Sequence, residues 1–403
     1  MTLIRPAVLA LALGAAQVAP QCGSSSTTPG SPSPTPTPPS TLNMQSVLVN
    51  AGPNNDYVNG LFTSVTICQP GTSTCQTVSG ILVDTGSSGL RVLSSAMNLT
   101  LPQQTSGGAP VVECAQFQDG FTWGPIQTAD LKLSGETASS VPIQVIGSPQ
   151  FSTIPSGCSS SGTAEDTLDD LGANGILGLS VFKDDCGPAC ASNGSSNPGF
   201  YYACPSSGCV VLAQPLARQL QNPVWLFASD NNGVMIQLPS VASGGAATLT
   251  GSLVFGVGTQ SDNTLGAARV FTTDAAGNFT TVFNGQSYAS SFIDSGSNGL
   301  FFLDSSTTGL QTCSDTTDFY CPPTPRAFTA TTRGGNGTTA SVAFSIDNAV
   351  TLLRNLRFSV FGELGGPNAG AFDWGLPFFY GRTVFTAIEG QSTPGGGGPY
   401  WAY

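Results

Sequence analysis

The sequence predicts an all-β protein that consists of two related lobes and has few short helices. Composition is the first indication: the chain of 403 residues contains 50 Gly and 29 Pro, and only 8% of it is charged. Such a mixture suits many short strands joined by turns better than it suits helices. The second indication is a ten-residue segment that occurs once in each half of the chain. An internal repeat of this kind indicates two copies of one structural unit.

The repeated segment reads Ile81-Leu-Val-Asp-Thr-Gly-Ser-Ser-Gly-Leu90 in the first half and Ser291-Phe-Ile-Asp-Ser-Gly-Ser-Asn-Gly-Leu300 in the second. Each copy is followed, many residues later, by an apolar segment that begins with Gly-Leu, at 178–182 and again at 375–379. Because both motifs recur in the same order, we expect an N-terminal lobe over residues 44–214 and a C-terminal lobe over residues 215–403. Within the second lobe, Pro215–Gln221 has the spacing of a short helix.

The N-terminal residues indicate export. Residues 1–21 have the pattern of a signal peptide, since Arg5 precedes an apolar run that is too short to span a membrane. Residues 22–43 are uncharged and rich in Pro, Ser and Thr, which predicts an extended tether. A lipid anchor at Cys22 is the alternative to release, and the sequence leaves both open. We therefore expect a secreted, periplasmic or envelope-anchored protein without a transmembrane segment.

The cysteines fit an oxidising compartment. There are 11, and setting Cys22 aside leaves an even set of ten (11 − 1) that can form five disulfides. Short spacings suggest four local bridges, and Cys114 with Cys158 then remain by elimination, although exchanges among the cysteines of 186–209 are equally open. The local pairs are Cys68–Cys75, Cys186–Cys190, Cys204–Cys209 and Cys313–Cys321.

Composition also excludes several classes of function. The chain has no His, which removes Ser-His-Asp triads, Cys-His pairs and His-ligated metal sites. Its formal net charge of −12 leaves no basic face for nucleic acid. The acidic pair Glu165-Asp166 with Asp169-Asp170 reads as an exposed turn rather than a calcium site. We therefore expect no metal, no cofactor and no nucleic-acid partner, and a monomeric protein.

The two Asp motifs point to a pair of carboxylates. Each Asp follows an apolar run, so each leaves the end of a buried strand. The next residue, Thr85 or Ser295, can bond locally or across to the other lobe. Glycines then allow a tight turn, and serines can donate to the carboxylate, which a buried Asp requires. These residues are Gly86 and Ser87 in the first copy and Gly296 and Ser297 in the second.

Both segments resemble the two catalytic loops of pepsin-like aspartic proteases. Asn174–Leu179 is similar to the apolar-apolar-Gly segment that supports the first loop in that family, and Phe372–Phe379 resembles its counterpart in the second lobe. The resemblance spans roughly residues 45–390 in consistent order. In general character the chain also resembles an uncharacterised family of exported bacterial proteins.

This resemblance implies a bilobal acid-protease fold, with barrel-like lobes on either side of a central cleft that takes a peptide or protein. It also implies that Asp84 and Asp294 are the catalytic residues of an aspartic endopeptidase. Two facing carboxylates share one proton, so that one acts as base on water and the other as acid; pepsin is the established example of such a pair. The predicted function needs no cofactor.

Some positions depart from the family's pattern. Arg91 stands where the family usually has Trp, and a cation there would favour ionised carboxylates. Trp123-Gly124 matches the start of the flap that covers substrate in the family, but the hairpin that follows is shortened. These departures favour the alternative hypothesis, a catalytically silent protein of the same fold that binds a ligand or has a structural role in the cell envelope.

Overall fold

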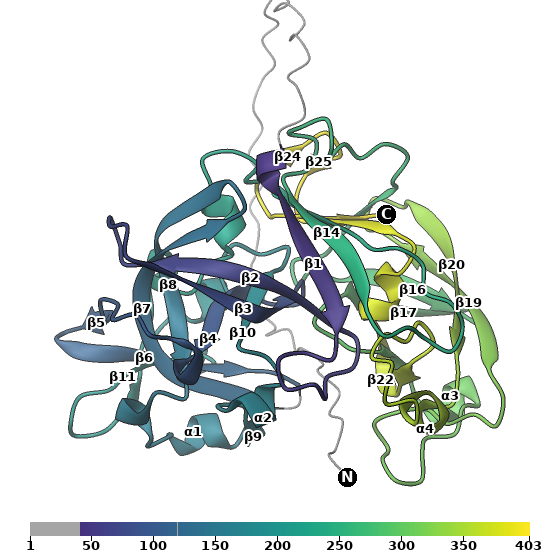
Figure 1. Ribbon diagram of the computed structural model, residues 1–403, viewed down its shortest axis with the longest axis horizontal. Helices are drawn as coiled ribbons and strands as arrows, with labels where there is room; N and C mark the ends of the chain where they lie inside the picture. Colours follow the sequence, from purple (N-terminus) through teal and green to yellow (C-terminus); the bar gives the residue numbers. More distant parts are fainter. Residues whose placement is uncertain (1–40, 119) are drawn as a thin grey trace, which may run out of the picture.

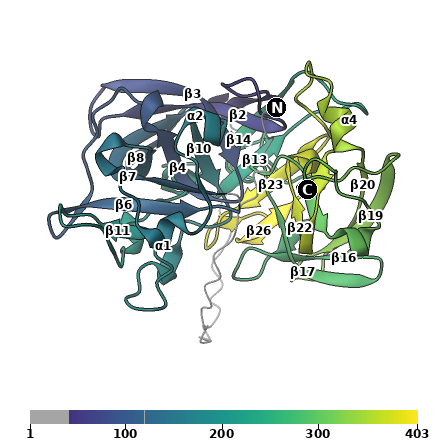
Figure 2. The same cartoon turned by 90° about the horizontal axis from the view of Figure 1, so that it is seen from below.

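The computed structural model describes residues 41–118 and 120–403 (Figure 1). It shows an all-β protein of two lobes, which confirms the predicted fold class. The first half of the chain, from purple to teal, lies beside the second half, from green to yellow, in two views at right angles (Figures 1 and 2). The predicted signal peptide, Cys22 and the tether up to residue 40 lie outside the described residues.

The N-terminal half consists of strands and two helical turns of four residues each, α1 and α2. Its strands belong to a 17-stranded sheet that extends into the second half of the chain. The elements are β1 Met44–Asn50, β2 Gly60–Cys68, β3 Cys75–Asp84, β4 Ser88–Leu93, β5 Thr105–Ser106, β6 Ala109–Gln116, β7 Gly120–Leu133, β8 Glu136–Ile146, α1 Ser156–Ser159, β9 Thr163–Ala164, α2 Leu168–Leu171, β10 Gly175–Leu179, β11 Tyr201–Ala203 and β12 Val210–Val211.

The C-terminal half contributes strands to the same sheet and forms a second sheet of seven strands, in the order β20-β19-β16-β17-β22-β18-β21. Its elements are β13 Gly233–Gln237, β14 Leu249–Phe255, β15 Val270–Thr272, β16 Phe279–Phe283, β17 Gln286–Ile293, β18 Leu300–Leu303, α3 Ser305–Thr308, β19 Arg326–Arg333, β20 Thr339–Ile346, α4 Ala349–Leu353, β21 Gly365–Gly366, β22 Asn368–Trp374, β23 Thr383–Ala387, β24 Ser392–Thr393, β25 Gly396–Gly397 and β26 Tyr400–Ala402.

The two lobes are joined by backbone hydrogen bonds between strands. β1 pairs with β2 of its own half and, along its other edge, with β14 of the second half. From β14 the sheet continues through β13 and β23 to β26 and β15. The largest apolar cluster likewise runs through both halves and includes Val83 and Ile293, the residues that precede the two Asp motifs. One connected core therefore supports both motifs.

The helix expected over Pro215–Gln221 is absent. Only Leu216–Arg218 forms a turn of 3-10 helix, and Gln219 is already extended. A segment this short cannot offset the cost of nucleating a helix by itself, so tertiary contacts determine its conformation. The buried Gln219 side chain makes two such contacts, accepting from Gly187 N and donating to its carbonyl oxygen.

In the described part of the chain, no helix has both the length and the apolar character needed to span a membrane.

All five predicted disulfides are present. The bridges are Cys68–Cys75, Cys114–Cys158, Cys186–Cys190, Cys204–Cys209 and Cys313–Cys321. The exchanges within 186–209 that the sequence left open are thereby decided in favour of the local pairs. Cys114 and Cys158 pack with Trp123 and Tyr202 in a separate apolar cluster of the N-terminal half.

The bridges are expected to differ in their effect on stability. Cys114–Cys158 joins residues 44 apart, so replacing both by Ala should lower the free energy of unfolding by about 4 kcal/mol. Cys204–Cys209 spans a separation of only 5, and its loss should cost about 2 kcal/mol. Urea denaturation of the two double-Ala variants measures the difference. Equal losses would show that the length of the closed loop does not determine how much each bridge stabilises the protein.

Candidate active site

Each Asp motif is supported by the same arrangement of three strands. In the first half, β3 ends at Asp84 and pairs in parallel with β10, which pairs antiparallel with β4 on its other side. In the second half, β17 leads to Asp294 and pairs in parallel with β22, which pairs antiparallel with β18. The apolar runs of the sequence thus form buried strands that bring each Asp to the end of its sheet.

Two glycines allow this arrangement because the Asp loops pass directly over them. A β-carbon at Gly178 would lie 2.7 Å from the carbonyl oxygen of Ser87, and one at Gly375 would lie 2.7 Å from that of Ser297. Neither gap accommodates a side chain. The Gly-Leu motif that recurs in both halves is therefore explained by close packing of the strand against the loop.

The two Asp loops are bonded to each other by reciprocal hydrogen bonds. The backbone N–H of Thr85 donates to Ser295 Oγ at 3.1 Å, and the N–H of Ser295 donates to Thr85 Oγ1 at 2.9 Å. Each hydroxyl then donates to the strand that precedes the opposite Asp, Thr85 to the Ile293 carbonyl and Ser295 to the Val83 carbonyl. These four bonds hold the loops of the two lobes in one fixed orientation.

Each carboxylate accepts the same two bonds within its own loop. Asp84 Oδ1 accepts from Gly86 N at 2.7 Å, and its Oδ2 accepts from Ser87 Oγ at 2.5 Å. Asp294 Oδ1 accepts from Gly296 N at 2.7 Å, and its Oδ2 accepts from Ser297 Oγ at 2.9 Å. Four of the six residues expected to support the pair thus bond to a carboxylate directly. The other two, Thr85 and Ser295, bond the two loops to each other.

The two carboxyl groups face each other. A β-carbon at Gly86 would lie 2.8 Å from Asp294 Cγ, and one at Gly296 would lie 2.7 Å from Asp84 Oδ1. Each loop therefore needs Gly because the carboxyl of the other loop occupies the adjacent space. The exposed fractions of the Asp84 and Asp294 side chains are only 2% and 0%.

Burial and charge change the protonation of this pair. The pKa of Asp294 is raised well above its usual range, first by burial and then by the charges of Asp84 and Asp373 and by a hydrogen bond with Asp84; the Gly296 N–H acts in the opposite direction. Adjacent carboxylates cannot both ionise at low cost, so the pair retains a shared proton at pH values where an exposed Asp has lost its own.

Asp373 is a third carboxyl that the sequence analysis did not assign to the site. It lies in β22, is 1% exposed, and is 2.6 Å from Ser297 Oγ, measured from its Oδ2. The signal that could have indicated it is an acidic residue between Phe372 and Trp374 in a strand otherwise expected to be buried. Periodicity alone does not reveal which neighbour such a residue contacts.

Trp123 and Gly124, expected in the flap over the substrate, lie within β7 and not at the tip of its hairpin. The turn between β6 and β7 is closed earlier, where Phe117 N donates to the Gly120 carbonyl. Trp123 is 3% exposed, and its indole N–H donates to the Phe151 carbonyl at 2.7 Å. A β-carbon at Gly124 would lie 2.0 Å from Val145 O, so the glycine serves close strand packing. The buried indole offers no surface to a substrate.

Arg91 is paired with carboxylates other than the Asp pair, so the expectation that it acts on the dyad is replaced. Its guanidinium is 2.7 Å from Glu113 Oε1 and 3.1 Å from Asp185 Oδ2, and it also donates to the Ser88 carbonyl. Burial by itself would lower the pKa of Arg91, but the charges of Glu113 and Asp185 outweigh it and the pKa is raised. Arg91 is therefore a buried structural cation of the N-terminal half.

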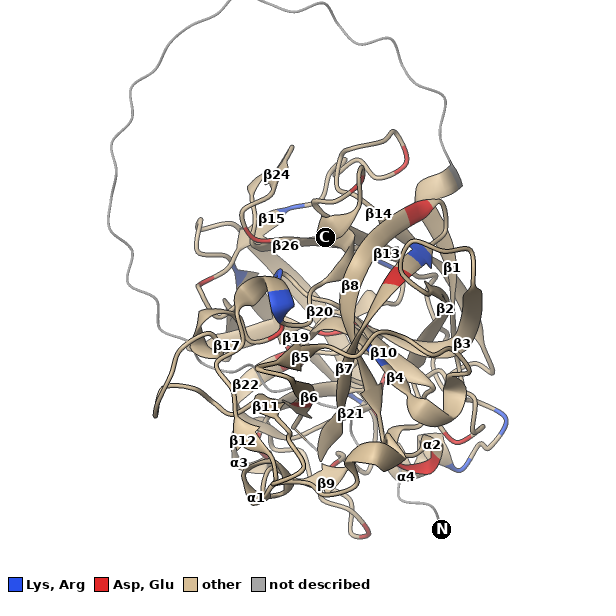
Figure 3. Ribbon diagram, turned by 90° about the vertical axis from the view of Figure 1, so that its left-hand side faces the viewer, with Lys and Arg blue, Asp and Glu red and all other residues tan. Residues whose placement is uncertain are grey.

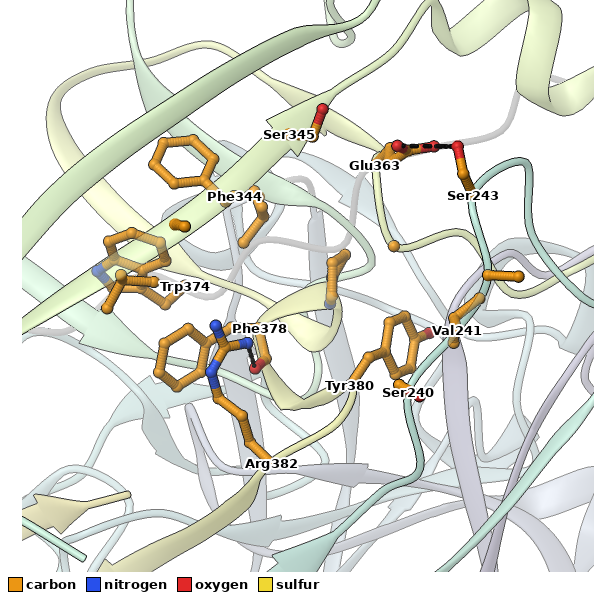
Figure 4. Close-up of a pocket in the computed structure, with 16 residues that line it drawn as sticks. Ser240, Val241, Ser243, Phe344, Ser345, Glu363, Trp374, Phe378, Tyr380 and Arg382 are labelled. Carbon is orange, nitrogen blue, oxygen red and sulfur yellow. Dashed lines mark hydrogen bonds between the residues drawn. The ribbon is translucent and has the colours of Figure 1, made fainter.

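A separate pocket of about 250 Å³ lies in the C-terminal half. Phe344, Trp374 and Phe378 line its apolar side, and Arg382 stacks on the Phe378 ring with 4.6 Å between guanidinium carbon and ring centre (Figure 4). On the opposite side Glu363 accepts from Ser243. Neither Asp of the pair belongs to this lining. Within 41–118 and 120–403, no group of three or more His, Cys, Asp or Glu could hold a metal ion.

Comparison with known proteins finds a solved structure to which the chain is similar and a family model that matches its sequence. Among solved structures, the chain is similar to the crystal structure of an aspartic proteinase from Irpex lacteus, with a TM-score of 0.49 and 14% sequence identity over 89% of this chain and 96% of that chain. No curated protein matches the sequence. A family model described as "Protein of unknown function (DUF3443)" matches residues 39–403, and the chain therefore belongs to that family.

Proposed function

We propose that this protein is an exported aspartic-type endopeptidase in which Asp84 and Asp294 are the catalytic residues. The observation that carries the proposal is the symmetry of the pair. Each carboxyl accepts from the Gly N–H and the Ser hydroxyl of its own loop, and the β-carbon position of each loop's Gly contacts the opposite carboxyl. Residues 44–214 and 215–403 are proposed to form the two lobes, with the substrate bound between them and the protein acting as a monomer.

The proposed reaction uses one shared proton. The ionised member of the pair takes a proton from a water molecule, whose oxygen attacks the peptide carbonyl carbon while the protonated member donates to the carbonyl oxygen. The resulting tetrahedral intermediate carries two hydroxyls. As its C–N bond breaks, one hydroxyl returns its proton to the Asp that had donated to the carbonyl oxygen, and the amine leaves with the proton that the other Asp had taken from the water. Asp84 and Asp294 thereby exchange protonation states within a cycle. The bonds across the loops keep both carboxyls in position and so limit reorganisation during the reaction.

Export is supported by the five disulfides, since such bridges persist in oxidising compartments. The positions of Lys and Arg along the ribbon are scattered over separate elements in Figure 3, and the net charge of −12 disfavours an anionic partner. A peptide or protein is therefore the proposed partner, and nucleic acid is not. Release and a lipid anchor at Cys22 both remain compatible with this proposal.

The proposal is tested by incubating the purified protein with a mixed peptide library between about pH 3 and pH 7 and sequencing the products, a window that includes the reference carboxyl pKa of about 4. We expect cleavage at acidic pH. Because the pKa of Asp294 is raised, the shared proton is retained above pH 4, so activity should extend above that value and fall once the proton is lost. Absence of new termini at every pH would reject the enzyme hypothesis.

The second candidate is a catalytically silent protein of the same fold that binds a ligand or has a structural role in the envelope. The burial of Trp123 favours it, because the aromatic residue expected to cover a bound peptide instead packs in the N-terminal half. Under this hypothesis, the wild type and an Asp84→Asn variant are equally inert towards the library, yet both retain the same bound peptide in an affinity measurement.

A further inference from the structure

Asp373 is a buried carboxyl for which the proposed reaction has no use. Its strand, β22, lies between β17 and β18, and Asp373 is opposite Phe292 on one side and Phe301 on the other. Neither β17 nor β18 contains a charged residue, and Tyr288 of β17 is their one titratable side chain. Burial first, and then the charge of Asp84, raise the pKa of Asp373, and an ionised Asp373 would in turn raise the pKa of Asp294.

The N-terminal lobe has no carboxyl at the position equivalent to Asp373. Counted from the supporting glycines, Gly178 and Gly375, the residue equivalent to Asp373 is Ile176 of β10, which is buried and apolar. Among the described residues, the Ser87 hydroxyl consequently bonds to one carboxyl, that of Asp84. Ser297 Oγ instead lies between two carboxyls, 2.9 Å from Asp294 and 2.6 Å from Asp373. Asp373 therefore breaks the symmetry of the pair.

A serine hydroxyl carries one hydrogen, so it can donate to only one of these two carboxyls. The other contact requires a protonated carboxyl that donates to Ser297 Oγ. Asp373 is the better place for this proton, because Asp294 also accepts from Gly296 N, whereas among the described residues Asp373 Oδ1 has no hydrogen-bond partner. A bare oxygen inside the protein is much less costly on a neutral acid than on a carboxylate.

We propose that Asp373 is a positioning residue: a neutral carboxylic acid whose O–H donates to Ser297 and so directs the Ser297 hydroxyl to Asp294. A hydroxyl that donates to Asp294 Oδ2 stabilises the ionised form of Asp294 more than the protonated form. The chain Asp373–Ser297–Asp294 therefore favours negative charge on Asp294 and lowers the pH at which the pair first ionises. The role in catalysis rests on the proposed function, but the protonation state and the direction of the hydrogen bonds do not.

Three substitutions and a control in the other lobe separate this role from simple packing. In Asp373→Asn the side-chain amide still donates to Ser297, so the titration of the pair should stay close to that of the wild type. In Asp373→Val the donor is lost, and the first apparent pKa of the pair should rise by about one unit. Ser297→Ala removes the shared hydroxyl, so adding Asp373→Val to it should cause no further rise. Ser87→Ala is the matched control in the other lobe, where adding Asp373→Val should still have its full effect.

The measurement is the ¹³C chemical shift of the side-chain carboxyls against pH, in the whole protein labelled at Asp Cγ. We expect the Asp373 signal to keep the shift of a neutral acid at pH 7, and the pair to titrate as stated for each variant. An Asp373 signal of an ionised carboxylate at pH 7 would overturn the proposal. So would a fall of the pair's pKa in both Asn and Val variants, since that is the effect of removing a negative charge.

The titration does not require turnover, so it is informative even if the protein cleaves no peptide. In that case the enzyme hypothesis fails while the positioning of Ser297 is still decided by the spectra. If the wild type is active, the low-pH limb of its activity profile should move up by the same amount in Asp373→Val and stay in place in Asp373→Asn. An unchanged limb in the Val variant, with a shifted titration, would restrict Asp373 to the resting enzyme and reject its proposed role in catalysis.

Discussion

Replacing Asp84 or Asp294 by Asn should reduce peptide hydrolysis by about a thousandfold or more, and either change alone should be sufficient. Asn keeps the size of the side chain and much of its hydrogen bonding, but it cannot exchange the proton that the reaction needs. Groups that act as one unit are not additive, so the double variant should be no worse than each single one. Steady-state rates on a peptide cleaved by the wild type measure the loss.

Stability provides the control for these variants. The pKa of Asp294 is higher in the folded protein than in the unfolded chain, so the folded state retains a proton that the unfolded state has lost above about pH 4. The free energy of unfolding therefore falls as the pH rises from there towards the raised pKa. Asp294→Asn removes this loss and should be at least as stable as the wild type at pH 7. Cleavage by a folded Asp84→Asn protein at a rate close to that of the wild type would refute the assignment.

Replacing Arg91 by Met should destabilise the protein by about 3–5 kcal/mol near neutral pH, because it leaves Glu113 and Asp185 buried without their cation. Arg91→Trp, which introduces the residue usual at this position in pepsin-like aspartic proteases, is expected to destabilise the protein to the same extent. Arg357→Met, a change at an exposed arginine, is the matched control and should have little effect on stability.

The pH dependence of this loss gives a second check. Burial and the charge of Glu113 already raise the pKa of Asp185 in the wild type. Without Arg91 the carboxyls become harder to ionise in the folded state, so the loss of stability should grow between about pH 4 and pH 7. Adding Glu113→Gln and Asp185→Asn should recover part of it. A loss that is equal at both pH values would instead indicate a packing defect.

Much of the fold was predictable because it depends on local chemistry. Short apolar runs separated by Gly and Pro indicate strands, and the repeated Asp motif indicates two copies of one unit. Spacing was sufficient for Cys68–Cys75 and Cys313–Cys321, whereas the pairing among the cysteines of 186–209 was left open by the sequence and decided by the structure. The expected helix at Pro215–Gln221 was wrong because the helical signal of so few residues is weaker than the contacts that hold Gln219 extended.

At the candidate site, too, local chemistry was predictable from the sequence and contacts between distant residues were not. The sequence by itself determined the Asp-Thr/Ser-Gly-Ser loops, since each needs a turn-forming Gly and donors within three residues of the Asp. Only the tertiary structure decided that Trp123 is buried, that Arg91 pairs with Glu113 and Asp185, and that Asp373 reaches Ser297. These contacts join residues from 22 to 94 positions apart. The physical reason is that burial of a charge or a ring depends on what other strands place beside it, and a residue's type does not specify that neighbour.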